Sequence, residues 1–162
     1  MNRRLISLVL TGLLGMYCGS AFAGSFTAGT GTLAGTVTDN STNFMWQQCS
    51  AGWTDADCAT DDLAIPNTYT WEAAISYCEV LSLGGLTDWR LPNIKELNSL
   101  VDDSKDSPAI DPPFANTQLS YYWSSTTSPG SSSAAWRVLF DSGGTDGSDK
   151  TSAHYVRCVR GQ

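Results

Sequence analysis

The sequence predicts a mixed α+β domain in which two short helices pack on a twisted antiparallel sheet and disulfides cross-link the chain. Three observations support this prediction. Residues 70–81 and 93–101 have the apolar spacing of two amphipathic helices. The last third of the chain, from residue 121 onward, contains strand patterns separated by glycine-rich turns. Four cysteines follow an apolar N-terminal leader.

Residues 1–23 have the pattern of a secretory signal peptide. Two arginines precede an apolar run from residue 5 to residue 17, and Ala21-Phe22-Ala23 is a small-x-small site that predicts cleavage after Ala23. Lipidation at Cys18 is the alternative, although the preceding tyrosine is bulkier than the small residue that lipidation requires. No later run is long enough to form a transmembrane segment, so we expect a secreted or periplasmic protein.

Removal of the leader makes the chain more acidic and leaves an even number of cysteines. Nine basic side chains oppose sixteen acidic ones, and the loss of the two leader arginines lowers the formal charge from −7 to −9. Such a surface repels polyanions, so nucleic acid is not an expected partner. Four cysteines in an oxidising compartment indicate two disulfides, with three connectivities open: Cys49, Cys58, Cys78 and Cys158.

The first part of the mature chain is predicted to be an arm, a hairpin and a loop. Residues 24–34 are small and polar, which is typical of a flexible arm. Residues 36–38 and 44–46 flank a turn-rich pentapeptide and therefore predict a β-hairpin. Residues 49–69 show no periodicity, so we expect a surface loop there.

Two helices with clear start signals follow. Thr70 is the expected N-cap of the first helix, and Gly84-Gly85 is the expected stop. Asn93 and Glu96 have the spacing of a capping box, and Pro92 prevents the second helix from extending backwards. The predicted buried stripe of the first helix consists of Trp71, Ala74, Ile75, Cys78 and Leu81.

The last third is predicted to be β-rich. A strand begins at Tyr121, and apolar side chains alternate from Trp136 to Phe140 as in a half-buried strand. Residues 141–149 are predicted to form a long polar turn, and residues 154–159 to form the terminal strand. Core packing is the default for the tryptophans in these helix and strand patterns, which are Trp46, Trp71, Trp89, Trp123 and Trp136.

The segments TWEAAISYCEVLS and DWRLPNIKEL resemble the domain family at the C-terminus of the Legionella collagen-like adhesin, a family of mostly unknown function. They are also similar, more distantly, to formylglycine-generating enzymes. Further matches at residues 35–47, 121–127 and 155–161 extend the resemblance over most of the mature chain, as one domain over 35–162. The residues that carry the structural motif are Trp71, Trp89, Arg90, Pro92, Asn93 and Glu96.

The resemblance implies a C-type-lectin-like (sulfatase-modifying-factor-like) fold. It also implies a Cys78–Cys158 disulfide between the first helix and the last strand, which leaves Cys49–Cys58 as a local cross-link. Formylglycine-generating enzymes bind copper(I) through a pair of cysteines, whereas this chain has no second C-terminal cysteine beside Cys158. We therefore expect no enzymatic activity and no cofactor.

The leading hypothesis is a binding module for a surface glycan or protein, with adhesion as its role. Trp53 is the first ligand-binding candidate because it lies in the polar loop between two cysteines, and Tyr121 and Tyr122 are the next. Two alternatives from other classes are a degenerate oxidase of the formylglycine-generating type and a structural subunit that contacts its neighbour through residues 24–34.

Charged side chains provide weaker candidates. Aspartates in two loops are candidate calcium ligands, although neither spacing matches an EF-hand. His154 is the sole histidine of the sequence and has no partner motif, which favours a structural role. Arg90, Arg157 and Arg160 are expected to be structural, with ligand carboxylates as the alternative partners. The candidate calcium ligands are Asp141, Asp146 and Asp149 in one loop, and Asp102, Asp103, Asp106 and Asp111 in the other.

Overall fold

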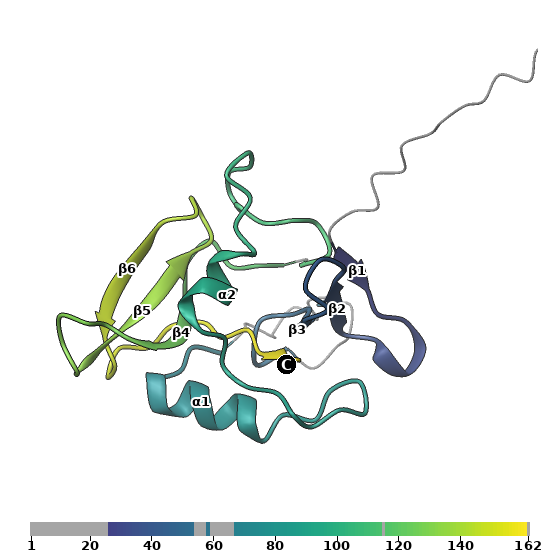
Figure 1. Cartoon of the computed structure of the whole chain (residues 1–162), viewed down its shortest axis with the longest axis horizontal. Helices are drawn as coiled ribbons and strands as arrows, with labels where there is room; N and C mark the ends of the chain where they lie inside the picture. The colour runs from purple at the N-terminus through teal and green to yellow at the C-terminus, as the bar shows by residue number, and fades with distance from the viewer. Residues whose placement is uncertain (1–25, 54–57, 59–66, 115, 162) are drawn as a thin grey trace, which may run out of the picture.

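The computed structural model describes residues 26–53, 58, 67–114 and 116–161, and these residues form two antiparallel sheets and two helices. The mixed α+β prediction is confirmed, with two sheets in place of the one expected. In Figure 1, α1 runs along the lower edge, the three-stranded sheet lies on the left and the strands β1 to β3 lie on the right. The predicted signal peptide and Cys18 lie outside the described residues, and none of the described helices is long and apolar enough to cross a membrane.

The four-stranded sheet has the order β1-β2-β3-β7. Strands β2 (Thr36–Asp39) and β3 (Met45–Gln47) form the predicted hairpin, and β7 (Val159–Arg160) pairs with β3. Within the turn, the Asp39 carboxylate accepts hydrogen bonds from the backbone N–H and hydroxyl of Ser41 and from the hydroxyl of Thr42. Burial raises the pKa of Asp39, but these hydrogen bonds outweigh it and hold the pKa below its usual value.

The prediction of a flexible arm is corrected for the residues that the structure describes. Strand β1 (Phe26–Ala28) pairs with β2, and a 3-10 helix, η1 (Gly31–Leu33), follows it. The ring of Phe26 packs edge-on against Phe114 with centroids 5.1 Å apart, a contact from distant sequence that no local pattern indicates.

The three-stranded sheet has the order β4-β5-β6, with β4 (Tyr121–Thr127), β5 (Ala134–Leu139) and β6 (Thr145–Asp149). The predicted polar turn of residues 141–149 is therefore too long, because its second half is strand β6. Residues with small side chains form this strand because β5 offers a free edge, and five residue pairs are in register between the two strands. The register between β4 and β5 shifts between Trp123 and Thr127, which marks a bulge in β4.

The helices α1 (Trp71–Glu79) and α2 (Ile94–Asn98) lie where the sequence predicts them. The N-cap positions and the capping box of Asn93 and Glu96 are confirmed, although the Thr70 side chain makes no capping hydrogen bond. Helix α1 ends before the glycine pair. Gly84 and Gly85 instead adopt positive φ angles of 64° and 72° in the turn that joins Leu83 to Leu86 by two hydrogen bonds.

The closing segment of the chain joins the two sheets. Residues 154–158 do not form the predicted strand; isolated bridges link His154 to Tyr69 and Tyr155 to Tyr122 before β7 begins. The two disulfides, Cys49–Cys58 and Cys78–Cys158, have the pairing that the resemblance implies. The second disulfide ties α1 to the residue before β7, so this bond fixes the position of the helix.

Candidate functional site

A groove of about 400 Å³ lies between α1, the segment before α2 and the bulge of β4. Helix α1 contributes Ile75 and Glu79 to its wall. The residues from the Trp-Arg-Leu-Pro motif and the α2 cap are Arg90, Leu91, Asn93 and Glu96, and β4 contributes Ser125. Its volume lies within the range of small-molecule sites in proteins.

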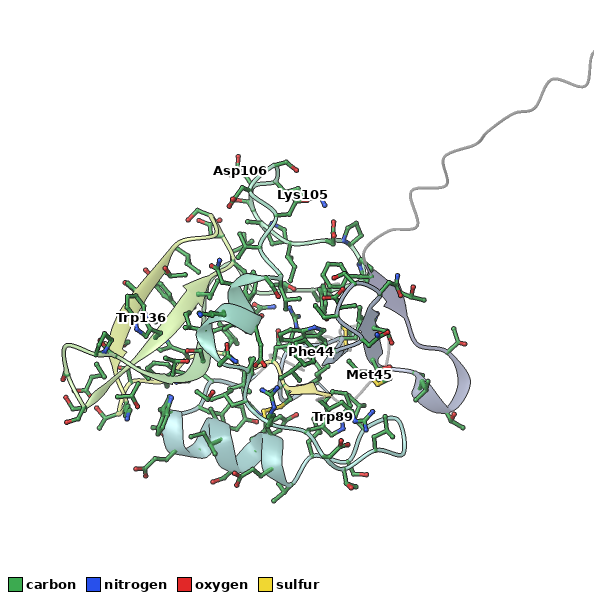
Figure 2. All side chains as sticks on the ribbon, in the orientation of Figure 1. Phe44, Met45, Trp89, Lys105, Asp106 and Trp136 are labelled. Atoms are coloured by element: carbon green, nitrogen blue, oxygen red, sulfur yellow. A yellow bond between two sulfur atoms is a disulfide. The ribbon has the colours of Figure 1, made fainter. Side chains whose placement is uncertain are left out.

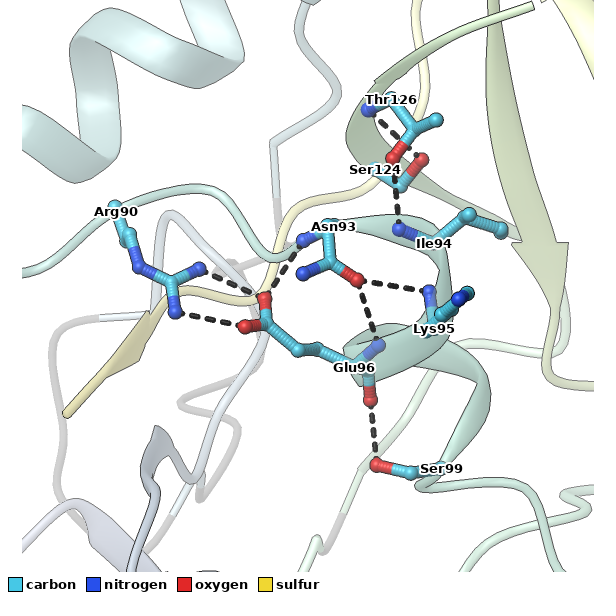
Figure 3. Close-up of polar contacts among 8 residues, drawn as sticks. All are labelled: Arg90, Asn93, Ile94, Lys95, Glu96, Ser99, Ser124 and Thr126. Carbon is cyan, nitrogen blue, oxygen red and sulfur yellow. Dashed lines mark hydrogen bonds and ion pairs between the residues drawn. The ribbon is translucent and has the colours of Figure 1, made fainter. Parts of the chain in front are cut away.

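One wall of the groove is held rigid by an ion pair. The Arg90 guanidinium donates two hydrogen bonds to Glu96, with N–O distances of 2.7 and 2.8 Å, and the backbone N–H of Asn93 donates to the same carboxylate (Figure 3). Burial raises the pKa of Glu96, but the hydrogen bonds and the charge of Arg90 outweigh it and lower the pKa below its usual value. The structural interpretation of Arg90 is therefore supported by a bidentate contact within the chain.

The bulge brings Ser125 into the groove. The backbone N–H of Ser125 donates to the carbonyl of Pro92 at 2.7 Å. The Thr126 hydroxyl accepts from the N–H of Ile94 at 3.0 Å, as Figure 3 shows. These two contacts fasten β4 to the start of α2. The position of Ser125 depends on residues more than thirty positions away along the chain, so no local sequence signal identified it.

Three polar groups of the groove have no hydrogen-bond partner among the residues that the structure describes. They are the Glu79 carboxylate, the Asn93 side-chain amide nitrogen and the Ser125 hydroxyl. The aliphatic side chains of Ile75 and Leu91 lie in the same lining. The groove thus combines two hydrogen-bond acceptors and an amide donor with an apolar surface.

A second polar cluster lies on the other face of the β4-β5-β6 sheet from α2. Arg137 donates to both oxygens of Asp146 and to Nε2 of His154, and its guanidinium lies 3.5 Å from the centroid of the Tyr121 ring. Ser148 Oγ is 3.1 Å from the same nitrogen of His154. Burial, together with the charge of Arg137, lowers the pKa of His154 to about 4.

This cluster contains a serine beside a histidine, which the sequence did not reveal, but its chemistry is poor for nucleophilic catalysis. The lone pair of Nε2 already accepts a hydrogen bond from Arg137, and a histidine with a pKa near 4 is a weak base at neutral pH. We interpret the contact between Ser148 and His154 as structural.

The aromatic candidates from the sequence lie in three different environments. Tyr122 is corrected: it is fully buried and its hydroxyl hydrogen-bonds to Ser50, so it belongs to the core. Tyr121 is partly exposed with one ring face covered by Arg137. Trp53 is partly exposed, and its neighbours 54–57 lie outside the described residues. None of the three lines the groove.

The tryptophans expected in the core mostly lie there. Trp46, Trp89 and Trp123 are at most 2% exposed, and Trp71 is half-buried. Trp136 differs from this expectation, because it is partly exposed on β5 and belongs to neither of the two buried clusters (Figure 2).

The other two arginines contact protein groups. Arg160 forms a bidentate ion pair with Asp88, with N–O distances of 2.6 and 2.9 Å. Arg157 is fully buried; its Nη2 donates to the carbonyl of Gln48 and the hydroxyl of Thr117. Burial lowers the pKa of Arg157. The structural interpretation fits both residues.

The candidate calcium ligands are separated and engaged by other groups. Asp146 pairs with Arg137, Asp149 accepts from Thr151, and Asp141 accepts from Ser107. No cluster of three potential ligands forms among the described residues.

The second acidic loop is organised by a lysine instead. Lys105 contacts both Asp102 and Asp111, and its hydrogen bond, with that of Ser104, lowers the pKa of Asp102 to about 2. Figure 2 places Lys105 and Asp106 at the tip of this loop, far from α1. A hollow of about 460 Å³ lies beside it, with a lining of apolar and polar side chains: Lys105, Asp106, Pro108, Ile110, Asp111, Pro112, Phe114 and Asn116.

The cysteine chemistry bears on the oxidase alternative. The four cysteines among the described residues are all in disulfides, so none of them supplies the thiolate pair that copper(I) requires. The alternative of a structural subunit assumed that residues 24–34 contact a neighbouring molecule. Residues 26–28 instead pair with β2 of the same chain, which weakens that alternative.

Comparison with known proteins identifies a family. The sequence model of the Lcl C-terminal domain matches residues 35–160. No curated protein matches the chain.

Proposed function

The chain belongs to the Lcl C-terminal domain family, and from this premise we propose that it is an extracytoplasmic, non-enzymatic binding module with a C-type-lectin-like fold. The groove between α1 and the Arg90–Glu96 pair is its binding site, and surface glycans are its ligands. Adhesion to a surface is the resulting role. The leader pattern of residues 1–23 supports the compartment.

The observation that carries the proposal is the contrast within the groove between a fixed wall and free polar groups. Arg90, Glu96 and the backbone of Asn93 satisfy one another, which holds the wall in one geometry before any ligand arrives. The Glu79 carboxylate and the Ser125 hydroxyl form no hydrogen bond with any described residue and remain available to a ligand. A preorganised site with a few unpaired polar groups beside apolar side chains is typical of small-ligand binding.

The fold assignment rests on the covalent link between α1 and the end of the chain. The Cys78–Cys158 disulfide joins the motif helix to the residue before β7, as the resemblance to lectin-like domains implies. The two disulfides also suit an oxidising compartment outside the cytoplasm.

A glycan array tests the proposal. The secreted chain should bind a subset of glycans, and Ser125→Ala should weaken that binding about tenfold, the effect of losing one well-placed hydrogen bond in a site where its partner is left unpaired. Ser76→Ala is the matched control, because Ser76 lies on the exposed side of α1 outside the groove. It should bind as the wild type does.

Two further arms of the array locate the site. A loss of binding in Trp53→Ala with Ser125→Ala unchanged would move the site to the Cys49–Cys58 loop. A loss of binding on addition of chelator would restore the calcium hypothesis. Binding to no glycan at all would refute the proposal.

A further inference from the structure

The charge balance of the groove narrows the ligand class, an inference that rests on the proposed function. Three charged side chains line the groove, and two of them, Arg90 and Glu96, neutralise each other at 2.7 Å. Glu79 forms no ion pair with any residue that the structure describes. The groove therefore carries one uncompensated negative charge.

The start of α2 offers no vacant backbone N–H donor to an anionic ligand. The Asn93 side chain accepts from the backbone N–H groups of Lys95 and Glu96, and the Thr126 hydroxyl accepts from Ile94. The N–H of Asn93 itself is taken by Glu96. A carboxylate or sulfate would thus meet the charge of Glu79 without the backbone donors that usually bind anions at a helix start.

A protonated amine, unlike an anion, would be attracted by the negative charge of Glu79. An ammonium group beside Glu79 gains a charge-assisted hydrogen bond. Ligand hydroxyls have partners in the Ser125 hydroxyl and the Asn93 amide nitrogen, and ring carbons can pack on Ile75 and Leu91. A lysine side chain would use the carboxylate but leave the other two polar groups unpaired, because its stem has no hydroxyl groups.

We infer that the groove binds an amino sugar, a hexosamine unit whose amine is free and protonated. Glu79 holds the ammonium group, and Ser125 and Asn93 bind the neighbouring hydroxyls. An N-acetylated sugar has no positive charge at this position, so it loses the contact with Glu79.

Calorimetry with short oligosaccharides tests the inference. We compare a glucosamine trisaccharide with its N-acetylated form and with a glucose trisaccharide, at pH 5.5 and physiological salt. The free-amine sugar should bind at least about tenfold more tightly than the other two, and Glu79→Gln should remove about that factor, the loss of one hydrogen bond between charged groups. The same variant should leave the weak binding of the N-acetylated sugar unchanged.

Glu72→Gln is the matched control, because Glu72 is an exposed glutamate of the same helix outside the groove. An equal loss in both variants would show that the acidic surface attracts the amine non-specifically and would overturn the inference. Equal affinity for the N-acetylated or glucose sugar would overturn the inference but leave the glycan-binding proposal standing. Failure of every sugar would remove both.

A lysine derivative separates the two amine sources. Nα-acetyl-lysine methylamide should bind at least about tenfold more weakly than the amino sugar, because it lacks the hydroxyl contacts. Equal affinity with the same dependence on Glu79 would assign the groove to lysine side chains and overturn the sugar assignment.

Discussion

The buried residues around α2 are large and apolar, whereas those beneath α1 are mostly small and include a disulfide. We call these groups the α2 cluster and the α1 cluster. The α2 cluster consists of Val37, Trp46, Leu97, Leu100, Ile110, Phe114, Tyr122, Val138, Phe140 and Val159. The α1 cluster consists of Ala51, Ala74, Cys78, Trp89, Leu91, Trp123, Ala135, Val156 and Cys158.

The difference shows that the two helices are held in place by different means. Apolar area removed from water stabilises roughly in proportion to its size, so the α2 cluster is held mainly by its bulky side chains. The alanines of the α1 cluster bury little area each, and the Cys78–Cys158 bond fixes α1 instead. Because α1 carries Glu79 and Ile75, the geometry of the groove depends on that bond.

The largest expected effect comes from removing this bond. The Cys78→Ala/Cys158→Ala double variant should lose about 4–5 kcal/mol of unfolding free energy. The two cysteines are 80 residues apart in sequence, so the unfolded chain gains much conformational entropy when the bond between them is removed. Cys49→Ala/Cys58→Ala, with a separation of 9, should lose about 2–3 kcal/mol. Urea denaturation of both variants measures the difference.

Hydrogen exchange sharpens the same comparison. In the variant without the Cys78–Cys158 bond, amides of α1 should lose protection first while β2 and β3 keep theirs. Equal destabilisation by the two double variants, or uniform loss of protection, would contradict the view that the bond specifically fixes α1.

Features that depend on neighbours in sequence were predictable. The capping box needs only Asn93 and Glu96, and the hairpin only the pattern of residues 36–46. The spacing of apolar residues also located α1 and most of its buried stripe, including Ala74 and Cys78. The disulfide pairing followed from the resemblance to a family and had no local basis.

Features that depend on distant partners were not predictable. Strand β6 contains Gly147 and Ser148, poor strand formers that pair because β5 lies beside them. The burial of Tyr122 depends on packing that includes Ser50, 72 residues away. The groove itself needs the bulge of β4, which brings Ser125 to Pro92. None of these contacts leaves a local pattern in the sequence.

A truncation in the α2 cluster tests the other half of the comparison. Leu97 is fully buried, so Leu97→Ala should cost about 3 kcal/mol, within the range for buried leucines. Lys95→Ala on the exposed side of the same helix should change stability by less than about 0.5 kcal/mol. Thermal and urea unfolding of both variants measure this. A cost for Leu97→Ala as small as for Lys95→Ala would show that side-chain packing does not hold α2.

The smallest expected effect is a dependence of folding stability on pH that arises from His154, which packs against the α1 cluster. His154 packs edge-on against Trp123 of the α1 cluster at 4.6 Å, and burial with the Arg137 charge lowers its pKa from 6.5 to about 4. Between these values the unfolded chain binds a proton that the folded chain does not, so stability should fall as the pH falls from 6.5 to 4.

The His154→Gln variant should remove this dependence, because glutamine does not titrate. The melting temperature of the wild type should exceed that of the variant by the largest margin at pH 7.0, and this margin should shrink at pH 5.5 and again at pH 4.5. Below about pH 4.5 both proteins should lose stability together, since the lowered pKa of Glu96 makes protonation of that carboxylate unfavourable to the folded state. Parallel curves for the two proteins between pH 6.5 and 4.5 would show that His154 is not the group that makes the α1 side sensitive to acid.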